Sequence, residues 1–136
     1  MRKKIFFFRR LCVNYLEPLR RQLQRPVVIN SGFRCPAVNA AVGGTPHSWH
    51  LQGCAVDIGC ASPREAVDIM DFFRRQLPLL KGLSYEEMYY HPTPHRGGYI
   101  HFAADCRQEP LGVQQRCRSN YQLALAYAKK AYILPN

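Results

Sequence analysis

The residues best suited to chemistry in this chain are a histidine and an aspartate that stand seven positions apart. They occur in the segment SWHLQGCAVD as His50 and Asp57, with Gly53 between them. Zinc takes imidazole nitrogen and carboxylate oxygen ligands at about 2.0–2.2 Å, and a catalytic zinc keeps one position open. Residues seven apart on a straight strand point to opposite faces, so a tight turn at Gly53 is needed to bring both side chains to one ion. The pair therefore predicts two ligands of a zinc site.

A third ligand is needed, and the apolar segment Tyr99–Phe102, which is typical of a strand, contains His101. A lone histidine among aromatic residues is more often a hydrogen-bonded core residue than a ligand. The prediction that His101 is a ligand therefore depends on His50 and Asp57, and not on its own surroundings.

These residues belong to a longer pattern, which resembles the zinc D-alanyl-D-alanine peptidases of the M15 family, close to the small versions found in phage and prophage lysis genes. Those proteins have SGYR-x-P-x-x-N, then GG, then S-x-H-x-x-G-x-A-x-D, and later an aromatic-x-His segment. The same order occurs here as Ser31-Gly32-Phe33-Arg34-x-Pro36-x-x-Asn39, Gly43-Gly44, Ser48 to Asp57, and Tyr99-Ile100-His101. The resemblance covers about residues 11–103.

The resemblance implies the Hedgehog/D-Ala-D-Ala-peptidase fold, with Zn²⁺ held by His50, Asp57 and His101. It also implies that Arg34 lies beside the zinc and pairs with a carboxylate or carbonyl oxygen of the substrate. A guanidinium suits this role because its rigid fork matches a carboxylate or a developing oxyanion. Ser48 is expected to hydrogen-bond within its loop, to support a ligand or to bind substrate. It is not expected to be a nucleophile, since no Gly-x-Ser-x-Gly sequence surrounds it.

The general base takes a proton from the attacking water and passes it to the leaving amine. Larger members of the family have Glu or Asp three residues before the last ligand, where this chain has Gly98. Small members have an upstream strand resembling FDQLI-x-E, to which Tyr85–His91 corresponds, so that His91 occupies the position of the glutamate and Glu87 that of the glutamine. The candidates for the base are His91, His95 and Glu87, and either histidine could instead be an exposed loop residue.

The elements that must position these residues do not alternate as βαβ units, which predicts an α+β fold with a small antiparallel sheet flanked by helices. Near-helical spacing of apolar residues predicts a helix within the first two dozen residues, with Pro18 at a kink or in a first turn. Ser62-Pro63 predicts the start of another helix, which is expected to stop near Pro78. Further expected elements are a buried strand at Val27–Ile29, a short helix at Cys35–Val42, strands at Cys54–Ile58, Tyr85–Tyr90 and Tyr99–Ala103, and a terminal helix at Ser119–Leu134.

The length of 136 residues predicts a single domain, with a family-like core at about 11–103 and a partly helical C-terminal extension at 104–136. The balance of charge is strongly basic, with 19 Lys and Arg against 9 Asp and Glu and a formal net charge of +10. Such a charge attracts polyanions, which include nucleic acid, acidic membrane surfaces and bacterial wall polymers. Charge alone therefore does not choose among these partners.

The N-terminal sequence MRKKIFFFRR imitates a signal peptide, but Arg9 and Arg10 end its apolar run after four residues and no cleavage site follows. No stretch approaches the roughly 20 apolar residues of a membrane span. We therefore expect cytoplasmic synthesis, with action on the cell wall after release or export by another route. Six cysteines without a CxxC pair do not form a four-cysteine zinc site, and they leave disulfides and free buried thiols open.

Together these features predict a monomeric zinc metallopeptidase that uses a metal-activated water to hydrolyse D-amino-acid-containing bonds of peptidoglycan stem peptides. The motif does not choose between a D-Ala-D-Ala carboxypeptidase and a cell-wall endopeptidase. One alternative is a catalytically inactive, zinc-bearing wall-binding module, which the glycine at position 98 favours. Another is a basic nucleic-acid-binding protein, which charge and the tyrosines Tyr89, Tyr90 and Tyr99 favour. This last class lacks a recognisable nucleic-acid fold motif and leaves the three ligands unexplained.

Overall fold

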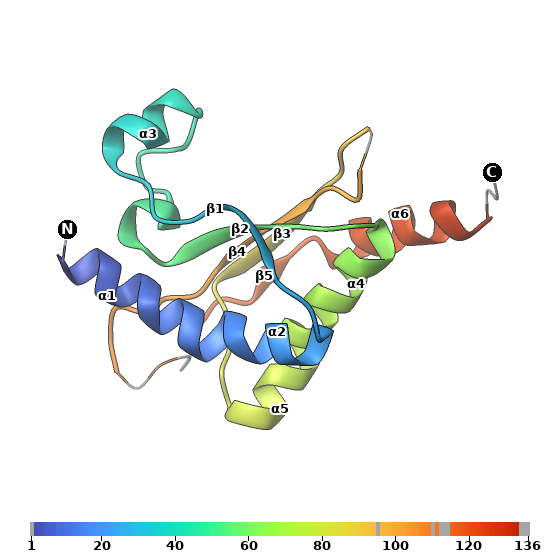
Figure 1. Ribbon diagram of the computed structural model, residues 1–136, viewed down its shortest axis with the longest axis horizontal. Helices are drawn as coiled ribbons and strands as arrows, with labels where there is room; N and C mark the ends of the chain where they lie inside the picture. Colours follow the sequence, from blue (N-terminus) through green and yellow to red (C-terminus); the bar gives the residue numbers. More distant parts are fainter. Residues whose placement is uncertain (1, 95, 110, 112–114, 134–136) are drawn as a thin grey trace.

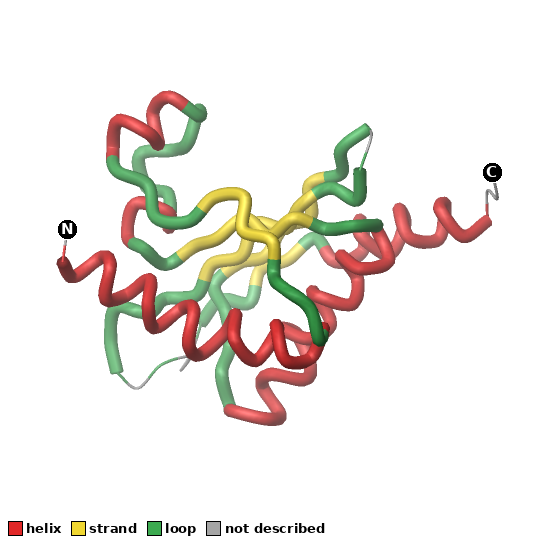
Figure 2. The backbone as a smooth tube through the Cα atoms, viewed as in Figure 1, coloured by secondary structure: helices red, strands yellow, loops and turns green. Residues whose placement is uncertain are grey.

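The computed structural model describes residues 2–94, 96–109, 111 and 115–133, and these residues confirm the α+β class. A five-stranded sheet lies at the centre of the molecule, with most of the helices on one side of it and the short helix α3 (Pro36–Ala41) on the other (Figures 1 and 2). Among the described residues, none of the helices combines the length and the apolar character that crossing a bilayer requires.

The predicted first helix is present and runs without a break through three segments. These are α1 (Arg2–Leu11), the π-helical turn η1 (Cys12–Leu16) and α2 (Glu17–Leu23). Pro18 lies in the first turn of α2, directly after η1, where the wider turn accommodates the proline ring and its missing N–H. Leu11, Tyr15 and Leu19 face the core from this helix and are almost fully buried.

The second long helix starts where the sequence predicts and ends later. Ser62 caps α4 (Pro63–Asp71) because its Oγ accepts a hydrogen bond from the backbone N–H of Glu65 at 3.1 Å. The expected stop near Pro78 is wrong, since the π-helical turn η3 (Phe72–Gln76) leads into α5 (Leu77–Lys81). The proline occupies the first turn of α5, where its missing N–H is tolerated, and the left-handed Gly82 ends the helix.

The sheet has the strand order β1-β2-β4-β3-β5, and its first four strands are antiparallel as expected. The strands are β1 (Val28–Ser31), β2 (Ala55–Gly59), β3 (Glu87–His91), β4 (Tyr99–Ala103) and β5 (Arg118–Ser119). The short strand β5 pairs in parallel with β3 and makes the sheet mixed. The expectation of a buried strand after Pro26 is wrong, because β1 is an edge strand in which Val28 and Ile29 are 52% and 40% exposed. A run of β-branched residues favours a strand but does not tell an edge from a centre.

The two faces of the sheet have different roles because successive side chains of a strand point to opposite sides. One face is covered by helices, and its residues on β2, β3 and β4 are at most 2% exposed: Val56, Ile58, Met88, Tyr90, Ile100 and Phe102. The other face is open and bears Asp57 and His101, which pair in register across β2 and β4. The buried face thus anchors β2 and β4 in the core, and the polar side chains of these strands lie on the open face.

The last residues that the structure describes pack onto the same sheet and helices. The helix α6 (Tyr121–Ile133) lies against α4, and Asn120 precedes it at the edge of β3. The Asn120 side chain accepts a hydrogen bond from the Tyr90 N–H at 2.6 Å and donates one to the Tyr90 carbonyl at 2.9 Å. Asn120 therefore satisfies the backbone N–H and carbonyl of Tyr90, which the short strand β5 does not reach. The assignment of the whole chain to one domain stays a prediction.

Candidate metal centre

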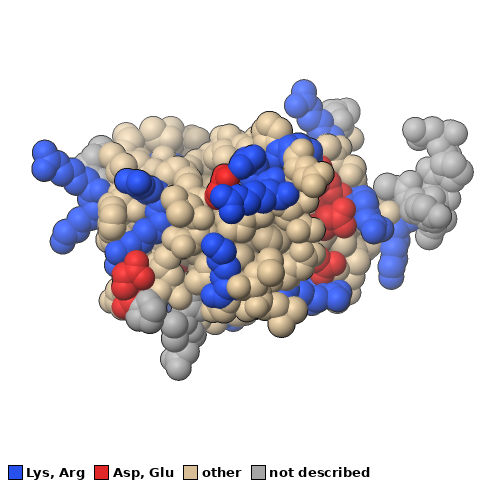
Figure 3. All heavy atoms as spheres, turned by 60° about the horizontal axis from the view of Figure 1, so that its bottom comes forward, with Lys and Arg blue, Asp and Glu red and all other residues tan. Residues whose placement is uncertain are grey.

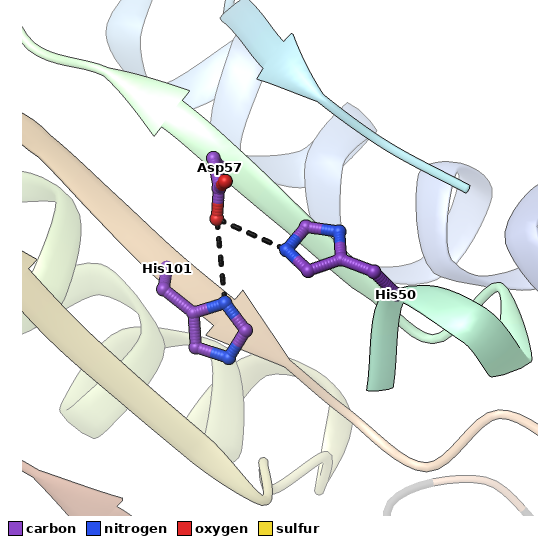
Figure 4. Close-up of side chains that lie close together, drawn as sticks. All are labelled: His50, Asp57 and His101. Atoms are coloured by element: carbon purple, nitrogen blue, oxygen red, sulfur yellow. Dashed lines mark hydrogen bonds and ion pairs between the residues drawn. The ribbon is translucent and has the colours of Figure 1, made fainter. Parts of the chain in front are cut away.

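Three side chains converge on the open face of the sheet, from three separate segments of the chain (Figure 4). Asp57 Oδ1 lies 3.1 Å from His50 Nε2 and 3.3 Å from His101 Nδ1, and the three donor atoms all lie within 4.8 Å of one another. Donors held about 2.1 Å from a tetrahedral ion are about 3.4 Å apart. The three residues could therefore hold one metal ion with small adjustments of their side chains.

The predicted turn at Gly53 brings His50 back toward Asp57. His50 lies in the short 3₁₀ helix η2 (Trp49–Gln52), whose N-cap is Ser48, and the Ser48 Oγ accepts a hydrogen bond from the His50 N–H at 3.2 Å. Gly53 follows in the left-handed conformation (φ 74°) and leads the chain into β2. A side chain at position 53 would also collide with the backbone carbonyl of Lys4, so both the turn and the packing of α1 require glycine.

Each histidine ring is anchored by its outer nitrogen and presents the other nitrogen to Asp57. His50 Nδ1 donates to the Gly32 carbonyl at 2.8 Å, and because a carbonyl only accepts, this nitrogen bears the proton. His101 Nε2 donates to Glu87 Oε1, also at 2.8 Å. Histidines that bind a metal usually donate their other ring N–H to a carbonyl or a carboxylate. This hydrogen bond fixes the tautomer and the orientation of the imidazole ring. The donor set is thus two oriented imidazoles and one carboxylate.

The electrostatics of the group favour a charged carboxylate between the rings. Burial opposes ionisation of Asp57, but its close interactions with His101 and His50 outweigh burial and hold its pKa well below the usual range. Burial likewise disfavours a charged His101, and its hydrogen bonds to Asp57 and Glu87 outweigh this and raise its pKa. Asp57 is therefore available as an ionised ligand throughout the neutral range.

Arg34 is fixed beside the possible ligands by three partners. Its Nη2 donates to Asp57 Oδ2 at 3.1 Å, its Nε to Ser31 Oγ at 3.0 Å, and its Nη1 to Asn39 Oδ1 at 3.4 Å. Asn39 is only 4% exposed and is itself held by the Thr45 carbonyl, to which its Nδ2 donates at 2.9 Å. In the sequence, Asn39 stands out only as one position of the motif. The structure shows that it orients the arginine.

The group lines an open hollow of about 530 Å³ that also brings the other candidate residues together. Residues in its wall include Arg34, Ser48, Glu87 and His91, in addition to the three possible ligands. The His91 ring stacks on Tyr99 with centroids 4.7 Å apart, and Tyr89 lies parallel to His101 at 6.4 Å. His95, the remaining candidate base, lies outside the described residues.

The two described candidates for the base have different surroundings. Glu87 is bonded to His101 Nε2, so its carboxylate orients a possible ligand. His91 is exposed, but it is the last residue of β3 and therefore not a loop residue. Partial loss of solvent around its ring and the nearby His101 lower the pKa of His91, so this imidazole favours the neutral form, which can accept a proton. An acid at position 98 does not fit this chain. Gly98 is left-handed (φ 81°), and a side chain there would collide with the His91 carbonyl.

Proteins that hydrolyse bonds with a metal ion keep it in an open groove and leave a coordination position for water or substrate. By its fold and its donor group, this protein is a candidate metallohydrolase. The chain belongs to the peptidase M15 family, whose model, described as Peptidase M15, matches residues 6–93. This confirms the resemblance found in the sequence, and the members of this family are metallopeptidases. No curated protein matches the chain.

Proposed function

We propose that this protein is a zinc peptidase that hydrolyses D-amino-acid-containing bonds in the stem peptides of bacterial peptidoglycan. The observation that supports it most is the convergence of His50 Nε2, Asp57 Oδ1 and His101 Nδ1 in an open hollow. Two imidazole nitrogens and one carboxylate oxygen are a ligand set that zinc takes in peptidases. Membership of the family supplies the peptidase class, and the substrate comes from the resemblance of the motif to the D-alanyl-D-alanine peptidases.

When bound, the ion would supply Lewis-acid chemistry, activating water and polarising the carbonyl of the bond to be cut. Arg34 would bind the substrate beside it. A guanidinium has five N–H donors, and three contacts use Nε and one N–H on each Nη. The two remaining N–H groups are available for a terminal carboxylate or for a carbonyl oxygen on which negative charge develops. Ser48 would support this wall of the hollow through its bond to the His50 backbone.

The test of the proposed function is turnover of a zinc-loaded preparation on a synthetic stem peptide that ends in D-alanyl-D-alanine and on isolated peptidoglycan. We expect release of D-alanine or of new amino groups, loss of turnover with a chelator, and recovery when zinc is added back. Cleavage of the short peptide assigns a carboxypeptidase, and cleavage of the intact network alone assigns an endopeptidase. Binding to peptidoglycan with no cleavage of either would favour the inactive wall-binding module, to which the glycine at position 98 points.

We propose His91 as the group that moves the proton, because its ring lines the hollow and favours the neutral form. Replacing His91 with alanine is expected to lower kcat by about 10²–10⁴, the usual contribution of general acid–base catalysis. The metal content should not change, since His91 does not touch the three donor atoms. Steady-state kinetics and metal analysis of the same preparation check both parts. An unchanged kcat would remove His91 from the mechanism.

Glu87 is expected to act through His101, which it holds by a hydrogen bond of 2.8 Å. The Glu87→Gln protein should bind zinc about 10–100-fold more weakly, as found when such an outer partner of a ligand is changed. Competition with a metal indicator measures this affinity. The matched control is Glu86→Gln, because the Glu86 carboxylate pairs with Arg116 and not with a histidine. Unchanged zinc affinity together with a fall in kcat would assign proton transfer to Glu87.

The proposal also covers the setting in which the enzyme works. A net charge of +10 favours encounter with the anionic wall, most strongly at low ionic strength. On the face drawn in Figure 3, Lys and Arg side chains are scattered among acidic ones and do not form one continuous stripe, which gives no support to a nucleic-acid partner. We propose a single-domain monomer that is made in the cytoplasm and reaches the wall after release or export.

A further inference from the structure

A second hollow, of about 450 Å³, lies at the end of β2, between β1, the loop that joins β3 to β4, and the start of α4. Asp57 pairs with His101 across β2 and β4, and two positions further along the same strands Gly59 pairs with Tyr99. Residues two apart on a strand point to the same face, so Gly59 and Tyr99 continue the surface that begins at the possible ligands. Tyr99 lines both hollows and forms the wall that they share. The two hollows are therefore neighbouring parts of one groove.

Gly59 contributes backbone without a side chain to the lining of the second hollow. A Cβ at Gly59 would stand 3.1 Å from Asn30 Oδ1 and 3.2 Å from Val28 Cγ1, so these two side chains of the edge strand β1 pack closely against the backbone of Gly59. Val28 contributes an exposed apolar group to the wall, and Asn30 contributes an amide. An extended peptide could therefore lie along this end of the groove in contact with β1.

Among the described residues around the second hollow, one cation has no acidic partner. Arg25 forms an ion pair with Glu65, and the other oxygen of Glu65 accepts a hydrogen bond from the Ala61 N–H at 2.9 Å. The charge of Arg25 is therefore already neutralised by Glu65. Arg96 is exposed at the rim, and within the described part of the chain its guanidinium forms no ion pair. The hollow thus offers a positive charge to an anionic group.

We propose that this second hollow binds a carboxylate that the substrate carries two or three residues before the bond that is cut. Two residues of extended chain span about 6.8 Å, the same as the step from Asp57 to Gly59 along β2. A peptide that passes Tyr99 therefore enters the second hollow, which Arg96 also lines, about two residues from the metal centre. In Figure 1, α3 lies near one end of the strands and the loop between β3 and β4 lies near the other end. Because Arg34 precedes α3 in the chain, we assign the α3 end to the residues after the cut and the loop end to the residues before it. This inference rests on the proposed peptidase function.

The test measures binding and does not depend on turnover. Two product-type peptides that end in a single D-alanine are titrated into the zinc-loaded full chain. They are identical except that the residue two positions before this D-alanine has a carboxylate in one and a carboxamide in the other. We expect the carboxylate peptide to bind about fivefold more tightly, the scale of one partly exposed ion pair, with a preference that shrinks as salt is added.

Two variants of Arg96 and one control complete the experiment. Arg96→Gln should bring the ratio of the two Kd values close to one, and Arg96→Glu should invert it. Arg64→Gln should leave the ratio as it is, because Arg64 is exposed on α4 and pairs with Asp68. Equal Kd values in the parent, no binding of either peptide, or a preference that survives in Arg96→Glu would overturn the inference. A parent that shows the preference but cleaves nothing would instead overturn only the proposed function.

Discussion

Replacing Asp57 with asparagine is expected to lower the rate of peptide hydrolysis by about a thousandfold or more. Asp57 Oδ1 is the atom that both histidines face, at 3.1 and 3.3 Å, so its charge is central to the donor group. A metal ion supplies several kcal/mol of charge stabilisation, and about 4 kcal/mol corresponds to a factor near 10³ in rate. Asparagine preserves the shape of the side chain but offers the ion no negative charge. The measurement is kcat/KM on a peptide that ends in D-alanyl-D-alanine.

The matched control for this change is Asp68→Asn, which removes a carboxylate that pairs with Arg64 on the exposed side of α4. This variant should retain the parent rate, because surface ion pairs of this kind contribute little. Circular dichroism of both variants confirms that the fold is intact. If the Asp57→Asn protein kept more than about a tenth of the parent rate, which is a loss of only about 1.4 kcal/mol, Asp57 would not be a ligand that the reaction needs.

Replacing Arg34 with alanine is expected to lower kcat/KM by about 10²–10³, as the loss of one fixed donor to a developing oxyanion does. The side chain is held by Ser31, Asn39 and Asp57 and still has two N–H groups to offer a substrate. Zinc should stay bound, because all three donor atoms remain. Arg34→Lys should recover only part of the loss, since an ammonium has the charge without the planar fork.

Kinetics and metal content of the two Arg34 variants separate substrate binding from support of the metal site. Loss of zinc from the Arg34→Ala protein would contradict the role given to Arg34, because it would show that the arginine is needed to hold Asp57 in place. Full recovery of the rate by lysine would contradict the use of the fork. The control is Arg20→Ala, whose guanidinium pairs with Glu17 on the exposed side of α2.

The possible ligands can be found in the sequence because most of their geometry is local. His50, Gly53 and Asp57 lie within eight residues. The conformational freedom of Gly53 is enough to explain how the side chains of His50 and Asp57 meet. His101 is forty-four residues beyond Asp57, and its register against β2 depends on strand pairing that no local pattern specifies. Only the resemblance to the M15 family connects the two.

The surroundings of the ligands are harder to predict, although one signal is present. Glu87, Tyr89 and His91 alternate along β3 and therefore share the face of His101. This period of two is enough to put Glu87 on the same face as His101, provided that the two strands are taken as neighbours. The bond from Arg34 to Asn39 joins the loop before α3 to a buried position of that helix, and the path of that loop has no comparable period in the sequence.

The errors in the predicted fold have local physical causes. A helix end at Pro78 is the ordinary expectation for a proline, but the π-helical turn η3 moves it into a first turn, where proline is tolerated. The β-branched residues after Pro26 favour a buried strand, but they lie at the edge of the sheet. The short strand β5 consists of two exposed residues, too few for a sequence pattern to reveal.

The most direct test of the metal centre is the zinc content of the purified parent beside that of its His50→Ala and Asp57→Asn forms. Each protein is dialysed against metal-free buffer and analysed by mass spectrometry of the elements, with circular dichroism as a check of the fold. We predict one zinc per parent chain and close to none in either variant. A full equivalent of zinc in both folded variants, or a parent that takes up no zinc when the metal is supplied, would contradict the assignment of these ligands.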